Sequence, residues 1–182
     1  AQKISTYNEL SKETIKKLKL GYIDNGYDIF AELKKKYNFE KLYKMGLMTK
    51  PQNKFTIKFK HTMIYPFFVE DKLMSFCSDD VTKRIRNIEC EKICEFIRNS
   101  NAAKIFILKN ERDCAYFYQN ITLKNQEYIA IPMSSTLIQN PDFLEICKSN
   151  KFEFYFSATD KLSFSKLKCT GVKVIKFEDE KE

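Results

Sequence analysis

Histidine and glycine are scarce in this 182-residue chain, and their scarcity excludes several kinds of active site. His61 is the only histidine, so a multi-histidine metal centre is excluded and any histidine-dependent triad must use that residue. The four glycines, at 21, 26, 46 and 171, cannot form the G-x-G-x-x-G motif of dinucleotide-binding proteins. Gly21 and Gly26 have the spacing of a phosphate-binding loop, but Tyr27 and Asp28 stand where Lys and Ser/Thr are required.

Long apolar runs and paired-cysteine motifs are missing as well. No stretch reaches the roughly 18 apolar residues of a membrane span, so we expect no membrane partner. The six cysteines, at 77, 90, 94, 114, 147 and 169, include no C-x-x-C pair, which argues against a zinc ribbon. The first residues do not have the form of a signal peptide, and we predict reduced cysteines and a cytoplasmic location.

Positive charge is present in excess and is unevenly distributed. The net charge is +8; residues 1–100 hold 20 basic and 13 acidic side chains, and residues 101–182 hold 12 and 11. A one-sided basic field is typical of proteins that bind polyanions such as nucleic acid, although a lysine-rich solvated surface explains the same composition. The candidate phosphate contacts in this basic part are Lys16, Lys17, Lys19, Lys34, Lys35, Lys36, Lys54, Lys58 and Lys60.

Hydrophobic periodicity changes along the chain and predicts an α+β part followed by an α/β part. Ser11 is a candidate N-cap for a helix that runs to Gly21, and residues 27–37 and 39–45 have helical spacing. Residues 55–60, 63–69 and 73–77 have strand character, and residues 88–99 form a linking helix. We therefore predict a small basic helical and β subdomain over residues 1–100.

From residue 103 the pattern alternates strand and helix, which favours a mostly parallel sheet with flanking helices over residues 101–182. The expected strands are 105–108, 128–132, 152–156 and 172–177, and the expected helices are 111–119, 141–148 and 162–167. Ligands of such sheets bind beyond the carboxyl ends of the strands. Here those ends carry residues 109–110, 132–135 and 157–160.

Several short motifs occur in the order found in bacterial-type DNA primases, and the chain resembles the catalytic core of that family. The residues that carry the resemblance are LKLGY at 18–22, DNGYD at 24–28, MGL at 45–47, FKHTMIYPF at 59–67, and LMSF at 73–76 with DVT at 80–82. The resemblance implies a basic N-terminal subdomain followed by a Toprim fold, and it extends from about residue 11 to about residue 168. The zinc-binding segment and the helicase-interacting tail of complete primases are not found, so we expect an excised core or, given the carboxylate losses described below, a stand-alone relative.

The Toprim resemblance implies a magnesium or manganese site made of carboxylates at strand ends, and this sequence departs from that pattern. Lys109 stands at the position of the family's glutamate, Ala158 at the first aspartate of its D-x-D pair, and only Asp160 matches. A lysine removes a ligand and adds a positive charge, which disfavours a two-metal mechanism. Glu111 and Asp113 leave an alternative open. If the alignment with the family is displaced by one or two residues, one of them supplies the carboxylate missing at Lys109. The candidate metal ligands are then Asp160 and Asp113.

Three hypotheses follow from these observations. The first is a primase-like protein of DNA replication that binds single-stranded DNA or RNA without a cofactor, with a degenerate site in which Lys109 contacts a phosphate. Tyr22 and Tyr27 are its candidate base-stacking residues, and His61, expected at the surface, is a candidate phosphate contact. The second is an active Mg²⁺- or Mn²⁺-dependent primase. The third is an interaction module for replication proteins that uses the helix at 88–99.

Overall fold

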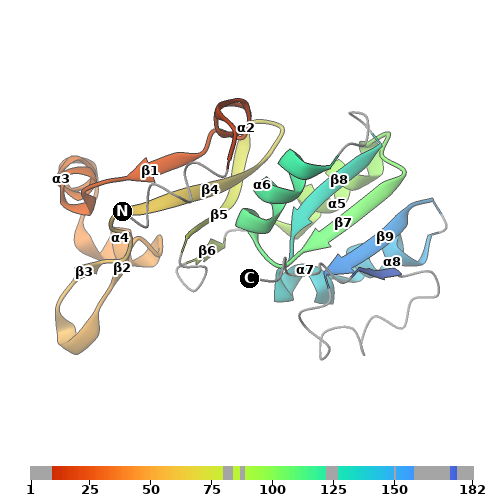
Figure 1. Ribbon diagram of the computed structural model, residues 1–182. Helices are drawn as coiled ribbons and strands as arrows, with labels where there is room; N and C mark the ends of the chain where they lie inside the picture. The colour runs from red at the N-terminus through yellow and green to blue at the C-terminus, as the bar shows by residue number, and fades with distance from the viewer. Residues whose placement is uncertain are drawn as a thin grey trace. The chain divides into compact units, whose positions relative to one another are not determined.

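The computed structural model describes residues 10–79, 84–86, 89–121, 127–149, 151–157 and 173–175 (Figure 1). The chain divides into two compact units, the first made of Ala1–Phe68 and Leu73–Asn87 and the second of Val69–Lys72 and Ile88–Glu182. This division assigns the helix near residue 90 to the second unit, whereas the sequence-based ranges 1–100 and 101–182 assign it to the first.

The first helix, α2 (Lys12–Lys17), begins at Ser11 as predicted, because the Thr14 amide donates a 3.0 Å hydrogen bond to the Ser11 hydroxyl. It ends earlier than predicted. Lys19 has a left-handed φ of 53°, and the Leu20 amide donates to the Ile15 carbonyl at 2.9 Å, which is the 6→1 bond of a Schellman motif. The chain then extends into strand β1 (Gly21–Ile23) instead of continuing as a helix.

The next two predicted helices are confirmed. Helix α3 (Gly26–Lys36) is capped by Asn25, and α4 (Phe39–Lys44) is capped by Asn38, each through a side-chain oxygen that accepts a backbone N–H. Gly46 terminates α4 with a φ of 75°, a conformation that glycine adopts at little cost. A Cβ atom at Gly26 would collide with the Phe59 carbonyl oxygen, so only glycine lets α3 approach that segment so closely.

The strands of the first unit form two sheets in the described residues. One has the order β1-β4-β5-β6, with β4 (Thr62–Val69), β5 (Lys72–Ser78) and β6 (Arg84–Arg86); β1 pairs with β4, and β5 with β6, antiparallel. The other pairs β2 (Met48–Thr49) with β3 (Thr56–Ile57), and a short 3-10 helix, η1 (Pro51–Asn53), lies between them. The strand predicted over 55–60 is therefore reduced to β3. The residues of this chain that precede Met48 belong to the end of α4, so they do not extend β2 and cannot lengthen its pairing with β3.

The β4–β5 hairpin turns at Glu70 and Asp71, which lie between the predicted strands 63–69 and 73–77. Both residues have positive φ angles, 48° and 61°, which is the pattern of a type I′ turn. Asn and Gly are the residues that normally occupy these positions, so the turn carries some backbone strain.

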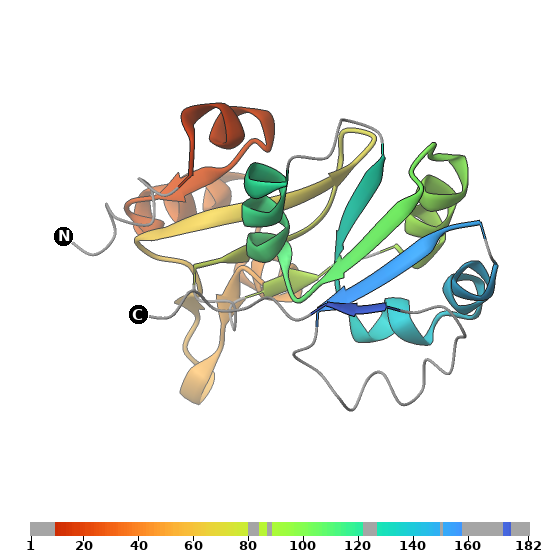
Figure 2. The ribbon, with the colours of Figure 1, turned by 45° about the vertical axis from the view of Figure 1, so that its right-hand side comes forward.

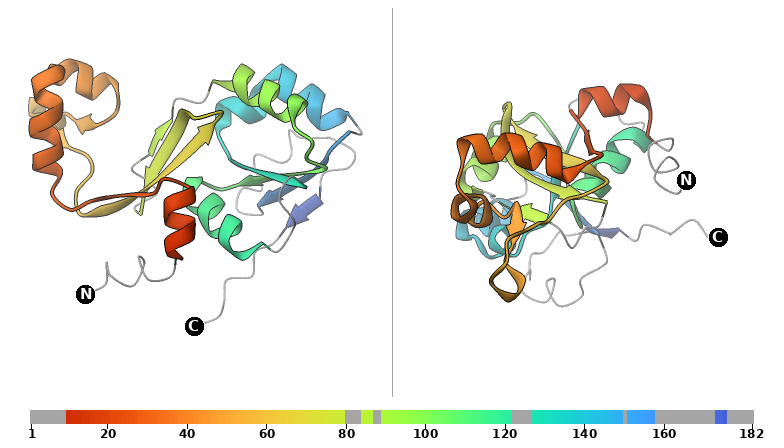
Figure 3. Two further views of the ribbon diagram at one scale, coloured as in Figure 1. Left: turned by 90° about the horizontal axis from the view of Figure 1, so that it is seen from above. Right: turned by 90° about the vertical axis from the view of Figure 1, so that its left-hand side faces the viewer.

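The second unit contains a parallel sheet, as the alternation of strand and helix predicts. Its strand order is β10-β9-β7-β8, with β7 (Lys104–Leu108), β8 (Tyr128–Pro132), β9 (Glu153–Ser157) and β10 (Lys173–Ile175). The pairs β7/β8, β7/β9 and β9/β10 are all parallel. Helix α6 (Glu111–Asn120) covers one face, and α5 (Cys90–Asn99), α7 (Ser135–Gln139) and α8 (Pro141–Lys148) cover the other (Figures 2 and 3). The predicted helix at 162–167 lies outside the described residues.

Helix α5 contributes to the core of the second unit. Ile93, Cys94 and Ile97 are fully buried, so these side chains do not form the partner surface that the interaction-module hypothesis requires. Burial raises the pKa of the Cys94 thiol to about 11, and its sulfur lies 3.9 Å from Asn140 Oδ1. The apolar face of α5 is thus explained by packing.

Candidate functional site

The carboxyl ends of the parallel strands meet at one edge of the sheet and carry the predicted site. The Met133 amide donates a 2.7 Å hydrogen bond to the Leu108 carbonyl, which joins the ends of β7 and β8. Register places Ile107 of β7 beside Phe156 of β9. Lys109, one residue beyond β7, is exposed at this edge.

Helix α6 starts directly after Lys109 and carries the two carboxylates of the alternative metal site. Asn110 is buried and caps the helix, since its Oδ1 accepts the Asp113 amide at 2.8 Å. Glu111 is 2% exposed and Asp113 is half-buried, and both lie in the first turn. The partial positive charge of a helix N-terminus stabilises carboxylates there, which gives both residues a structural role without a metal.

A second buried cap closes the loop after β8. The Ser134 hydroxyl accepts the Leu137 amide at 3.0 Å and lies 2.9 Å from the Thr136 hydroxyl, and it starts α7. In the parts of the chain that the structure describes, no three or more His, Cys, Asp or Glu side chains gather in a way that would hold a metal ion. Ala158 and Asp160 lie outside the described residues, so the predicted pair of Asp160 with Asp113 stays a prediction.

The basic candidates of the first unit lie at its surface. Lys19, held in its left-handed conformation, places its ammonium 4.9 Å from the Phe68 ring centre. Lys60 donates a 3.1 Å hydrogen bond to the Tyr27 hydroxyl, and its ammonium lies 4.6 Å from the Tyr27 ring centre. The exposed lysines of the predicted set are Lys16, Lys17, Lys19, Lys34, Lys35, Lys36, Lys54 and Lys60, and Lys58 is half-buried.

The predicted stacking residues and the histidine are also accessible. Tyr22 is 37% exposed and Tyr27 is 61% exposed, so each presents part of its ring to solvent. His61 lies at the surface as expected, with its Nδ1 atom 3.6 Å from Asp24 Oδ1. Phe59, by contrast, is buried in the core, as its strict alternation with Lys58 and Lys60 indicates.

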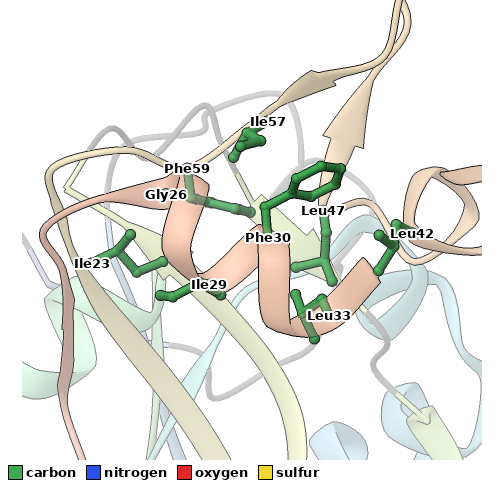
Figure 4. Close-up of a pocket in the computed structure, with 9 residues that line it drawn as sticks. All are labelled: Ile23, Gly26, Ile29, Phe30, Leu33, Leu42, Leu47, Ile57 and Phe59. Carbon is green, nitrogen blue, oxygen red and sulfur yellow. The ribbon is translucent and has the colours of Figure 1, made fainter. Parts of the chain in front are cut away.

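Two features of the first unit were not found from the sequence. One is an aromatic series in which Phe30 stacks on Phe39 at 5.5 Å between ring centres, and Phe39 contacts Phe55 at 5.4 Å. The other is a hollow between α3, α4 and β3, which we call the α3 groove (Figure 4). The side chains that line it come from Ile23, Gly26, Ile29, Phe30, Leu33, Leu42, Leu47, Ile57 and Phe59. Helical spacing predicts the face of α3 but not the segments that meet it.

Asp79, which follows β5, holds the end of that strand in the sheet of the first unit. Its carboxylate accepts the Tyr65 hydroxyl at 2.8 Å and the Met63 amide at 3.0 Å. Its own amide donates to Thr62 Oγ1 at 3.2 Å. Asp79 therefore fastens the end of β5 to the start of β4, and this carboxylate is engaged within the sheet.

Comparison with known proteins relates the chain to a primase by structure. No protein-family model and no curated protein sequence matches it. The chain is similar to the crystal structure of the RNA polymerase domain of Mycobacterium tuberculosis primase DnaG, with a TM-score of 0.58 and 11% sequence identity. That similarity covers 100% of this chain and 69% of the other. Across the described residues no helix is long and apolar enough to cross a membrane. The chain has a primase-like fold.

Proposed function

We propose that this protein is a primase-like nucleic-acid-binding protein of DNA replication whose Toprim-like site does not use metal catalysis. The observation that carries the proposal is the similarity of the whole chain to the RNA polymerase domain of a primase, at a TM-score of 0.58. A match over the full length includes both the basic unit and the unit with the parallel sheet. A shared fold alone does not establish a shared activity, so the residues at the sheet edge decide the chemistry.

Lys109 is the main reason to propose binding without catalysis. It follows β7 at the sheet edge and is exposed, where the resemblance implies a metal-binding glutamate. An ammonium group repels a divalent cation and attracts a phosphate. The buried caps Asn110 and Ser134 hold the loops on either side of this edge. Lys109 thus has the charge and the accessibility for a phosphate contact.

The lysines of the first unit support a backbone-tracking mode of binding. Each lysine that neutralises a phosphate releases condensed counterions, so affinity falls as salt rises. Tyr22 and Tyr27 have exposed rings that we propose as stacking faces for unpaired bases, and the Tyr27 ring lies 4.6 Å from the Lys60 ammonium. We propose single-stranded DNA or RNA as the ligand of this surface and replication proteins as its functional context.

The test is fluorescence anisotropy with a labelled single-stranded oligonucleotide from about 50 to 200 mM salt, with and without Mg²⁺. We expect binding that weakens steeply with salt and is indifferent to Mg²⁺. Lys109→Glu should weaken binding at low salt. The matched control is Lys148→Glu, the same charge change at an exposed lysine that ends α8, ahead of the amino end of β9.

Two outcomes oppose the proposal. Tighter or unchanged binding by Lys109→Glu at low salt would remove Lys109 from the site. Binding that requires Mg²⁺, together with primer synthesis from labelled nucleotides, would establish the active metal-dependent primase instead, with Glu111, Asp113 and Asp160 as its first residues to substitute.

A further inference from the structure

The α3 groove is an apolar surface feature whose lining includes none of the residues proposed above to contact nucleic acid. Its floor contains the buried side chains Leu42 and Phe59, and its walls include Ile29, Phe30 and Leu33 from one face of α3 (Figure 4). Gly26 lets the start of α3 approach the Phe59 backbone, which closes one end. The lining consists of aliphatic side chains and two phenylalanines, so it offers few flat faces to a nucleic-acid base.

The groove is incompletely covered by the protein itself. Ile29 is 43% exposed, and Phe30, Leu33, Leu47 and Ile57 are only partly buried. Exposed aromatic side chains of α4 continue this apolar surface: Phe39 stacks on Phe30 of the groove lining, and Phe39 and Tyr43 both contact Phe55. Apolar surface gathered in one place, as opposed to scattered singly, is typical of a protein-binding site.

The charge around the groove defines what it would bind. From Gly26 to Lys60 the chain carries nine lysines and only three carboxylates, Asp28, Glu32 and Glu40. On the helical wheel of α3, Lys34 and Lys36 lie on either side of the face that carries Ile29, Phe30 and Leu33. The Lys60 side chain packs beside Gly26 at the closed end. An apolar groove is therefore bordered by positive charge.

We propose that the α3 groove binds an acidic amphipathic peptide segment of a partner protein. Apolar side chains of the segment insert between Ile29, Phe30 and Leu33, and its carboxylates pair with Lys34, Lys36 and Lys60. Apolar burial supplies affinity, and charge complementarity selects acidic partners and accelerates association. The proposal uses lysines of the basic unit but does not rest on nucleic-acid binding.

The test uses the full chain and a fluorescein-labelled helical peptide with Leu at positions i, i+3, i+4 and i+7 among Glu residues. We expect a saturating anisotropy change below about 100 μM peptide. Two control peptides, with every Glu changed to Gln or every Leu changed to Ala, should each bind at least about tenfold more weakly. Equal binding of the Leu-to-Ala peptide would show charge attraction alone and overturn the proposal, as would absence of binding.

Matched variants of the protein locate the site. Ile29→Glu places a carboxylate in the groove, whereas Ala31→Glu makes the same charge at an exposed position on another face of α3. We expect a loss of at least about tenfold for Ile29→Glu and less than about threefold for Ala31→Glu. A second pair, Lys36→Glu against Lys35→Glu, should show the same order, because Lys35 lies opposite the groove and pairs with Glu32. Equal losses within each pair would overturn the proposal.

A single-stranded oligonucleotide separates the two ligands. Ile29→Glu and Ala31→Glu should bind it equally, because they change the net charge equally. If Ile29→Glu selectively weakens the oligonucleotide and not the peptide, the groove belongs to the nucleic-acid site and the peptide proposal fails.

Discussion

Asp79 joins β4 and β5 of the first unit, and its removal should destabilise that unit more than its half-buried position suggests. In Asp79→Ala two hydrogen bonds to a carboxylate disappear, one from the Tyr65 hydroxyl at 2.8 Å and one from the Met63 amide at 3.0 Å. Tyr65 is fully buried, so water does not readily replace the lost acceptor. A buried donor left without a partner costs about 1–3 kcal/mol, and hydrogen bonds to charged groups contribute about 1.5–3 kcal/mol.

We expect Asp79→Ala to lower the free energy of unfolding by about 3 kcal/mol, and Tyr65→Phe, which removes one hydrogen bond, by about 1.5 kcal/mol. The double variant should cost less than the sum by at least about 1 kcal/mol, because both changes remove the same hydrogen bond. Urea unfolding followed by far-UV circular dichroism gives these values. Hydrogen exchange at the Met63 amide reports the first unit specifically.

Asp79→Asn is the matched control. It retains one side-chain oxygen acceptor but replaces the other by an NH2 donor, so only one of the two hydrogen bonds, from Tyr65 or from Met63, keeps its acceptor. Asp79→Asn should therefore cost less than Asp79→Ala, about 2 kcal/mol. An Asp79→Ala variant within about 0.5 kcal/mol of the wild type would refute the reasoning, as would additive costs in the double variant. Either result would mean that water substitutes for the carboxylate.

Three further predictions concern single positions. Asp71→Gly should stabilise the protein by about 0.5–1 kcal/mol, seen as a higher urea midpoint, because Asp71 has a φ of 61° in the β4–β5 turn. Asn110→Ala should cost about 1 kcal/mol through loss of the α6 cap, and Asn110→Ser should recover most of it; equal costs would contradict the capping role. Cys94 should react with iodoacetamide much more slowly than the half-buried Cys90 at pH 8, because burial raises its pKa to about 11. Peptide mapping that finds equal labelling of Cys94 and Cys90 would oppose this account. Since the thiol of the unfolded chain ionises near pH 9, the free energy of unfolding should also decline as pH rises from 9 towards 11.

The elements that sequence predicted well are those with strong local signals. Helix α3 has an N-cap at Asn25, an apolar face and a basic last turn, and these signals act within a few residues of one another. Strands β4 and β5 were predicted at 63–69 and 73–77 because each is a separate run of mainly apolar residues. Periodicity and capping residues specify these elements because the signals lie within the elements themselves.

The elements that sequence missed depend on distant partners. Strand β1 exists because Gly21 to Ile23 pair with β4, about forty residues later. Strand β3 is shorter than predicted because its partner β2 has only two residues, Met48 and Thr49, and begins just after the end of α4. The left-handed φ of Lys19 carries no compositional signal, since glycine normally occupies that position.

By itself, the sequence excluded multi-histidine metal centres and phosphate-binding loops, placed most of the net positive charge in the first hundred residues, and predicted the alternation that yields a parallel sheet. Those conclusions need only composition and local spacing. The strand order β10-β9-β7-β8, the position of Lys109 at the sheet edge beside the end of β8, the burial of Glu111 and the α3 groove required the tertiary structure. Each of these arises from contacts between segments far apart in the chain, and such contacts depend on packing and chain topology that local periodicity does not encode.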